Sequence, residues 1–197
     1  MNSPQPTHPT LIIVRGLPGS GKTYLAAELI KALGEDQVVM LDPDAIDFDS
    51  PEYAQHVQAL TTEGVDPKLH AYRFLRAQAY QAIEARQIII WNQPFTNLEI
   101  FNKMIARLRD HAVEHGTELP LLIVEVEIDP VVAKERVEQR KQQGGHGPSD
   151  DTFARRVDDY TSFAPHGYTT VSVRGDDDVT ASVAKVVQAL QDLPAES

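Results

Sequence analysis

Residues 11–23, Leu-Ile-Ile-Val-Arg-Gly-Leu-Pro-Gly-Ser-Gly-Lys-Thr, decide the fold of this chain. The apolar run at 11–14 predicts a buried strand, and residues 24–30 predict the helix that follows it. Between them, residues 16–23 fit the glycine-rich Walker A pattern G-x-x-x-x-G-K-[S/T]. Its glycines allow a tight turn whose backbone N–H groups face inward, and the helix start adds the positive end of its dipole. The stretch therefore predicts a loop that binds the phosphates of a nucleotide.

The same loop predicts roles for single side chains. Lys22 is expected to reach the β- and γ-phosphates, and the Thr23 hydroxyl is expected to bind Mg²⁺. ATP and Mg²⁺ are accordingly the expected cofactors. The expected nucleotide-binding residues are Gly16, Leu17, Pro18, Gly19, Ser20, Gly21, Lys22, Thr23 and Tyr24.

Strand and helix patterns alternate along the rest of the chain, which predicts a parallel sheet with helices on both faces. One domain is expected over residues 10–197, preceded by a flexible, proline-containing tail at 1–9. The five expected strands are 11–14, 37–41, 87–92, 121–128 and 169–173. The expected helices are 22–33, 51–62, 67–86, one from Thr96 or Asn97 to 115, 130–143, 149–163 and 179–193.

Composition narrows the class of protein. The chain has 197 residues, a formal net charge of -11 and no cysteine. An acidic balance argues against an extended nucleic-acid surface or a membrane surface, and the lack of cysteine excludes disulfides and thiolate chemistry. The first ten residues lack the pattern of a signal peptide, and no apolar run has the length of a membrane span. A cytoplasmic location is expected.

Three of the expected strands end in polar groups, at the edge of a parallel sheet where ligands bind. The phosphate loop follows the first strand, Asp42 and Asp44 follow the second, and Asn92 follows the third. Asp44 is the expected carboxylate that orients or deprotonates an acceptor hydroxyl, and Asp42 is the expected metal group beside Thr23. Asn92 stands where many phosphate-loop enzymes have an acid, so Thr23, water and Asp42 are expected to carry more of the coordination. The alternative for both aspartates is a solvated acidic loop.

Arg136 and Arg140 are four residues apart on one predicted helix and share a face. The glycine-rich break at 144–147 lies just beyond them and is expected to act as the hinge of a lid at about 136–156. In a closed lid these arginines would neutralise charge on a phosphoryl group in transfer. A surface helix with weak ion pairs is the alternative. Further candidates on the returning helix are Arg155 and Arg156.

The segment His111-Ala112-Val113-Glu114-His115 fits the His-x-x-Glu-His pattern of an inverted zinc protease. It lies at the polar end of a predicted helix, and the sequence offers no obvious third ligand. Because a nucleotide site already accounts for the chemistry of the chain, zinc proteolysis is not expected.

Three stretches carry a family resemblance: GLPGSGKT at 16–23, LDPDAID at 41–47 and IDPVVAKERVEQRKQQGGHGPS at 128–149. They resemble the zeta-toxin and polynucleotide-kinase branch of P-loop kinases, over most of residues 10–163. The resemblance implies an α/β fold of the P-loop NTPase type, a three-layer sandwich with a five-stranded parallel sheet, helices on both faces and a helical lid. It also implies ATP-dependent phosphorylation of a hydroxyl.

By position, the resemblance implies phosphate and Mg²⁺ roles for Lys22 and Thr23 and an acceptor-activating role for Asp44. It makes Arg136 and Arg140 the lid arginines, and in relatives one such arginine can also stack near the adenine. Asn92 departs from the acid often found after the third strand of these kinases.

The expected activity is transfer of the γ-phosphoryl group of ATP to a hydroxyl of a small molecule, a nucleotide sugar or a nucleic-acid end. The partners are then ATP and an unidentified hydroxyl-bearing acceptor, with no membrane partner, and the oligomeric state is open. Two alternatives remain. One is a nucleotide-dependent binding module or slow ATPase switch without an acceptor, and the other is a nucleotidase-like hydrolase.

Overall fold

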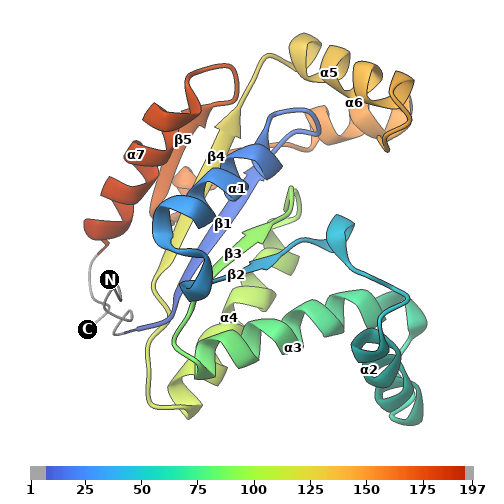
Figure 1. Ribbon diagram of the computed structural model, residues 1–197, viewed down its shortest axis with the longest axis vertical. Helices are drawn as coiled ribbons and strands as arrows, with labels where there is room; N and C mark the ends of the chain where they lie inside the picture. Colours follow the sequence, from blue (N-terminus) through green and yellow to red (C-terminus); the bar gives the residue numbers. More distant parts are fainter. Residues whose placement is uncertain (1–7, 194–197) are drawn as a thin grey trace.

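The computed structural model describes residues 8–193, which form a five-stranded parallel sheet with helices on both faces (Figure 1). The strand order is β2-β3-β1-β4-β5. The strands are β1 Thr10–Gly16, β2 Val38–Leu41, β3 Ile88–Asn92, β4 Leu121–Glu127 and β5 Thr170–Arg174. The helices are α1 Lys22–Leu33, α2 Pro51–Thr62, α3 His70–Glu84, α4 Leu98–Glu114, α5 Pro130–Gln142, α6 Asp150–Asp158 and α7 Val179–Gln191. The predicted fold class is confirmed.

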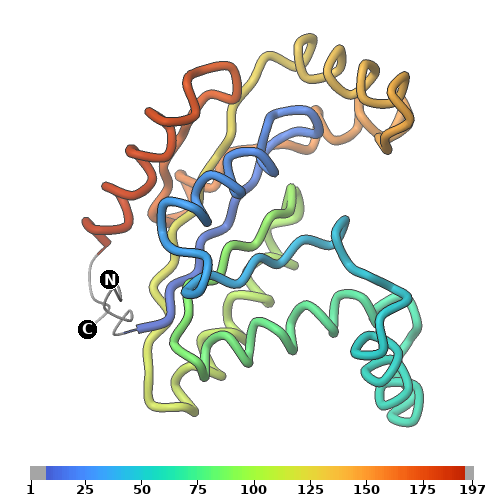
Figure 2. Tube along the Cα trace, in the orientation of Figure 1, coloured from blue at the N-terminus to red at the C-terminus, as the bar shows by residue number. Residues whose placement is uncertain are grey.

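Two apolar cores lie on opposite faces of the sheet, and β1 supplies side chains to both. Leu11 and Ile13 pack with residues of α3 and α4, whereas Ile12 and Val14 pack with residues of α1 and α7. Successive side chains of a strand point to opposite faces, so a strand that is covered on both sides reads as a continuous apolar run. In the trace of Figure 2, α1 (blue) and α7 (red) run along the sheet.

Most helix starts follow the signals in the sequence. The Asn97 side chain accepts a hydrogen bond from the Ile100 amide, and the Asp129 side chain accepts one from the Val131 amide. These caps satisfy amides that have no partner inside the helix. Asn97, rather than Thr96, is therefore the cap of α4.

The helix predicted over residues 149–163 is wrong at its carboxyl end, because α6 stops at Asp158. The backbone beyond it is held by a buried ion pair. The Thr161 carbonyl accepts a hydrogen bond from Arg15, and the Phe163 amide donates one to Glu125. These long-range bonds replace the bonds that would continue the helix.

Helices α5 and α6 form a pair at the carboxyl end of the strands, apart from the two helical layers (Figure 1). Residues 143–149, which join them, are almost entirely exposed. The predicted tail at 1–9 lies outside the described residues except for His8 and Pro9. None of the helices in the described part of the chain combines the length and apolar character that a membrane span requires.

Candidate functional site

The glycine-rich loop joins β1 to α1 at the carboxyl edge of the sheet. Its last residue, Gly21, caps α1 without a side-chain acceptor, so no side chain competes for the first amides of the helix. The Ser20 hydroxyl is buried and lacks a hydrogen-bond partner within the described residues. Gly19 has φ of +84°, and a Cβ there would lie 2.3 Å from the Ala133 carbonyl oxygen of α5. The loop therefore has the backbone and the unused donors of an anion site.

Lys22 is a half-buried cation next to this loop, and its Nζ donates a 2.8 Å hydrogen bond to the Leu17 carbonyl. Burial lowers the pKa of Lys22 from 10.5 to about 8. The guanidinium groups of Arg156 and, more weakly, Arg140 contribute to this lowered pKa, whereas the carboxylates of Asp42 and Asp44 oppose it. These four charged side chains, which are spread over more than a hundred residues of sequence, thus all interact with the Lys22 ammonium group.

Asp42, Asn92 and Thr23 form a polar cluster next to the loop. The Asn92 amide nitrogen donates to Asp42 Oδ2 at 2.7 Å and to Thr23 Oγ1 at 3.1 Å. The register Leu41↔Trp91 places the ends of β2 and β3 side by side, which brings the two side chains together. The side-chain oxygen Oδ1 of Asn92 is buried and lacks a hydrogen-bond partner among the described residues. Carboxylate and hydroxyl oxygens are ligands that suit Mg²⁺, and hydrogen bonds to Asn92 bring the predicted pair Thr23 and Asp42 together.

Asp44 lies two residues beyond Asp42 in a short 3₁₀ turn. Its backbone amide donates to Asp42 Oδ1 at 2.9 Å, which fixes the turn. Residue 44 is exposed. The two carboxylates therefore point in different directions. Asp42 faces Asn92, whereas Asp44 is open to solvent near Lys22.

The two predicted lid arginines lie in different surroundings. Arg136 Nη1 donates a 3.0 Å hydrogen bond to the carbonyl of Gly175, in the loop after β5. Gly175 touches the phosphate loop, because a Cβ there would lie 1.8 Å from the Ser20 carbonyl oxygen. Arg140 is exposed and acts electrostatically on Lys22, as Arg156 does more strongly. The structure thus brings Arg140 and Arg156 towards the phosphate loop and Arg136 towards the loop after β5.

A small cavity of about 70 Å³ lies beside the start of α1, against the loop after β5. Its walls mix apolar and polar groups, and they include Gly175 and the predicted residue Tyr24, whose side chain is largely exposed. The lining residues are Gly21, Tyr24, Leu25, Val126, Val173, Arg174, Gly175, Asp177, Val179 and Ser182.

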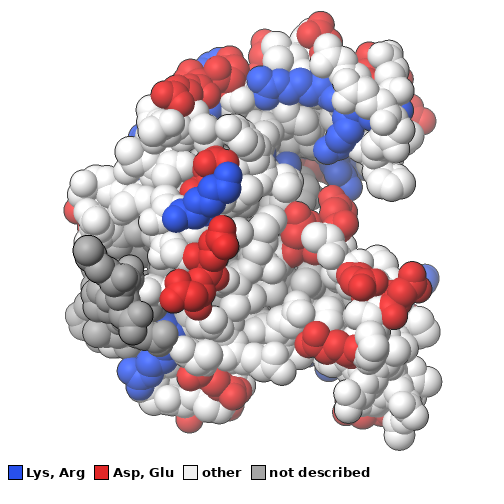
Figure 3. All heavy atoms as spheres, in the orientation of Figure 1, with Lys and Arg blue, Asp and Glu red and all other residues white. Residues whose placement is uncertain are grey.

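A larger hollow opens in the surface between the α5–α6 end and the α2 end of the molecule (Figure 3). Lys and Arg side chains lie along its α5–α6 side, and Asp and Glu side chains lie along the opposite side. The site is therefore polarised, with positive charge where an anionic phosphate would sit against the helical pair.

Arg15 and Glu125 form a buried ion pair in the sheet that carries the site. The sequence analysis did not predict this pair. They are register partners in β1 and β4, and Arg15 Nη1 lies 2.6 Å from Glu125 Oε1. Arg15 also donates to the carbonyls of Pro94, Phe95 and Thr161, and its guanidinium lies 3.7 Å from the centre of the Phe163 ring. The available signal was a charged residue inside an otherwise apolar strand, Arg15 in LIIVRG and Glu125 in LLIVEVE.

Comparison with known families adds to this geometry. A model of the family described as AAA domain matches residues 11–162. The chain belongs to this family. The match takes in the phosphate loop, the Asp42–Asn92–Thr23 cluster and both helices of the α5–α6 pair. A comparison with curated proteins gave no match.

Several solved structures share the fold of this AAA domain protein. A candidate kinase from Chloroflexus aurantiacus J-10-fl superposes with a TM-score of 0.67 at 22% identity, covering 94% of this chain and 100% of that chain. A gluconokinase from Sinorhizobium meliloti 1021 has a TM-score of 0.57 at 15% identity, covering 95% and 94%. The PezAT toxin–antitoxin structure of Streptococcus pneumoniae has a TM-score of 0.57 at 15% identity, covering 98% and 80%. At these identities the likeness extends to the fold, and membership of the zeta-toxin branch stays a prediction.

Proposed function

We propose that this AAA domain protein is a Mg²⁺-dependent kinase that transfers the γ-phosphoryl group of ATP to a hydroxyl group. The acceptor belongs to a small molecule, a nucleotide sugar or a nucleic-acid end. One observation carries the proposal: the Lys22 ammonium lies within electrostatic reach of two carboxylates, Asp42 and Asp44, and of two guanidinium groups, Arg140 and Arg156. Phosphoryl transfer needs such a combination of charge stabilisation and a carboxylate near the acceptor.

The proposed domain spans residues 10–197. The proposed nucleotide site spans residues 16–24, with the loop amides and Lys22 holding the phosphates. The exposed ring of Tyr24 and the cavity beside it would contact the base, because that cavity adjoins the loop and its walls include apolar side chains. Arg136, which donates to Gly175 in the wall of the same cavity, then lies at the base end of the nucleotide, as does Arg174, which lines the cavity. In this assignment Arg136 lies near the base of the nucleotide and Arg140 lies near its phosphates.

Thr23 and Asp42 would hold the Mg²⁺ ion. When bound, the ion would neutralise negative charge that develops on the phosphate oxygens. Asn92 adds no charge itself, but its amide nitrogen holds the Asp42 carboxylate next to Thr23. Asp42 thereby supplies the charge that an acid at position 92 would otherwise bring.

Asp44 is the proposed acceptor-side carboxylate. It is exposed, which leaves it accessible to an acceptor hydroxyl, and its backbone is fixed by the hydrogen bond to Asp42. It would orient the hydroxyl and take its proton as the oxygen bonds to phosphorus and the ADP oxygen leaves. Arg140 and Arg156 would stabilise the charge of the phosphoryl group in transit.

The deciding experiment incubates the protein with γ-labelled ATP, Mg²⁺ and separate pools of sugars, nucleotide sugars and 5′-hydroxyl oligonucleotides. The proposal expects label on a component of one pool, and no label with the Lys22→Ala variant. Release of labelled phosphate without any labelled acceptor would instead indicate a slow ATPase switch or a hydrolase. Full ATP binding and turnover by Lys22→Ala would contradict the proposed nucleotide site.

A further inference from the structure

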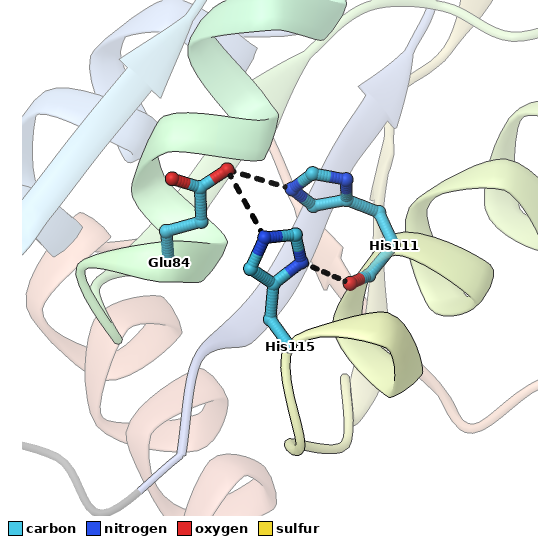
Figure 4. Close-up of side chains that lie close together, drawn as sticks. All are labelled: Glu84, His111 and His115. Atoms are coloured by element: carbon cyan, nitrogen blue, oxygen red, sulfur yellow. Dashed lines mark hydrogen bonds and ion pairs between the residues drawn. The ribbon is translucent and has the colours of Figure 1, made fainter.

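A second group of metal-ligating side chains lies far from the phosphate loop, at the carboxyl ends of α3 and α4 (Figure 4). Glu84 is the last residue of α3, and His111 and His115 lie four residues apart at the end of α4. Because α3 leads into β3 and α4 into β4, these helix ends lie where the strands begin. The phosphate loop lies at the opposite edge of the sheet.

The three side chains converge on one point. His111 Nε2 lies 3.0 Å from Glu84 Oε1, and His115 Nε2 lies 3.7 Å from the same oxygen. All three ligand atoms lie within 4.8 Å of one another. A tetrahedral ion with bonds of about 2.1 Å keeps its ligand atoms about 3.4 Å apart. The observed separations bracket that value, so small side-chain rotations would admit an ion.

A hydrogen bond on the far side of the His115 ring fixes its orientation. His115 Nδ1 lies 2.8 Å from the His111 carbonyl oxygen, which can only accept, so Nδ1 carries the proton (Figure 4). His115 Nε2 is the ring atom that faces the Glu84 carboxylate. A backbone carbonyl behind the ring is also the usual support of a metal-bound histidine.

Two further features favour a cation here. The carboxyl end of a helix carries a partial negative charge, and both α3 and α4 end at this cluster. The His111 ring is held in place, since it stacks on Tyr80 with ring centres 4.0 Å apart. His115 and Glu84 have side chains 43% and 48% exposed, so an ion can enter from solvent.

We propose that Glu84, His111 and His115 form a binding site for a divalent transition-metal ion, with Zn²⁺ as the expected ion. Two imidazoles and one carboxylate suit Zn²⁺ and its neighbours, whereas Mg²⁺ prefers oxygen ligands alone. The fourth position is left to water. The ion would clamp the ends of α3 and α4, the two helices that cover one face of the sheet. The third ligand is Glu84, not Glu114 of the sequence motif, so the site is no inverted zinc protease.

The test uses the full chain after treatment with a chelator. Isothermal titration with ZnCl₂ in excess Mg²⁺ is expected to give one site per chain, and Co²⁺ is expected to give visible absorption bands that Zn²⁺ displaces. His115→Ala and Glu84→Gln should each weaken Zn²⁺ binding by at least about tenfold. Bound Zn²⁺ should raise the melting temperature of the wild type, because it binds the folded state.

Glu114→Gln is the matched control, since it removes the same charge one residue from His115 and lies outside the ligand group. It should bind Zn²⁺ like the wild type. Lys22→Ala should bind Zn²⁺ normally too, so failure of the kinase proposal leaves this one standing. Equal affinity in wild type and His115→Ala, or loss of binding in Glu114→Gln equal to that in Glu84→Gln, would overturn the site. Melting curves without metal confirm that each variant folds, and the exposed position of His115 keeps that variant informative.

Discussion

The amide of Asn92, at the end of β3, donates a 2.7 Å hydrogen bond to the carboxylate of Asp42, at the end of β2. This bond joins two strand ends that are fifty residues apart and places a carboxylate where the sequence of β3 lacks one. The metal chemistry of the proposed kinase therefore depends on β2 more than on β3.

Asp42→Asn should raise the Mg²⁺ concentration needed for half-maximal turnover by about tenfold or more, because it removes the only charge of the cluster. Turnover is measured against Mg²⁺ at saturating ATP. Asp49→Asn, which makes the same charge change at an exposed position between β2 and α2, is the control. An identical Mg²⁺ dependence in the two variants would remove Asp42 from the metal site.

Nucleotide affinity should depend on pH through Lys22, whose pKa is lowered to about 8 by burial. The phosphates favour the protonated amine, so binding raises this pKa, and above pH 8 binding must take up a proton. Affinity is then highest below pH 8 and falls about fivefold between pH 8 and pH 9. Titration calorimetry at pH 9 in buffers of different ionisation enthalpy reports the uptake. The Lys22→Met variant should show none, and equal uptake there would assign it to another group.

Asp44→Asn should leave ATP binding unchanged and slow transfer by about 100- to 10,000-fold, the usual loss of a general base. ATP affinity from calorimetry and acceptor labelling at saturating ATP separate the two effects. A variant that labels its acceptor at the wild-type rate would exclude Asp44 from proton transfer.

Arg156 and Arg155 are neighbours on α6 with different surroundings, which makes them a matched pair. Arg156 acts on Lys22, whereas Arg155 is exposed and donates to Thr152 Oγ1 at 3.4 Å. Arg156→Gln should lower kcat by about 10- to 1000-fold, less than loss of a sole arginine finger because Arg140 shares the task. It should also raise the pKa of Lys22 and move the pH dependence upward. Arg155→Gln should change neither, and equal losses in both variants would contradict the assignment.

Glu125→Gln should lower the free energy of unfolding by about 3–5 kcal/mol, because it leaves the buried Arg15 guanidinium without its counter-charge. Urea unfolding measures the loss. Glu127→Gln, at an exposed position of the same strand, should change stability little. If the two variants unfolded at the same urea concentration, the ion pair would not support the fold.

Local signals in the sequence predicted much of this structure. The apolar runs located every strand to within about two residues, and the Walker A pattern located the loop, because both depend on neighbouring residues. The pairing of Arg15 with Glu125 was not predictable, since it follows from the register of β1 on β4 across 110 residues. Glu84 was missed as a partner of His111 for the same reason. Arg136 differs from Arg140 because it donates to a carbonyl in the loop after β5. The sequence of their shared helix carries no signal for that long-range contact.

The Arg15–Glu125 pair also bears on where the folding unit ends. The family match stops at residue 162, yet the Phe163 amide and ring complete the surroundings of this pair. Truncation at Ser162 would also remove β5 and α7, which would expose the edge of β4 and the apolar side chains that Val171, Val173 and Val186 cover. The segment that identifies the family is therefore shorter than the segment that can fold, and an expression clone should extend through α7.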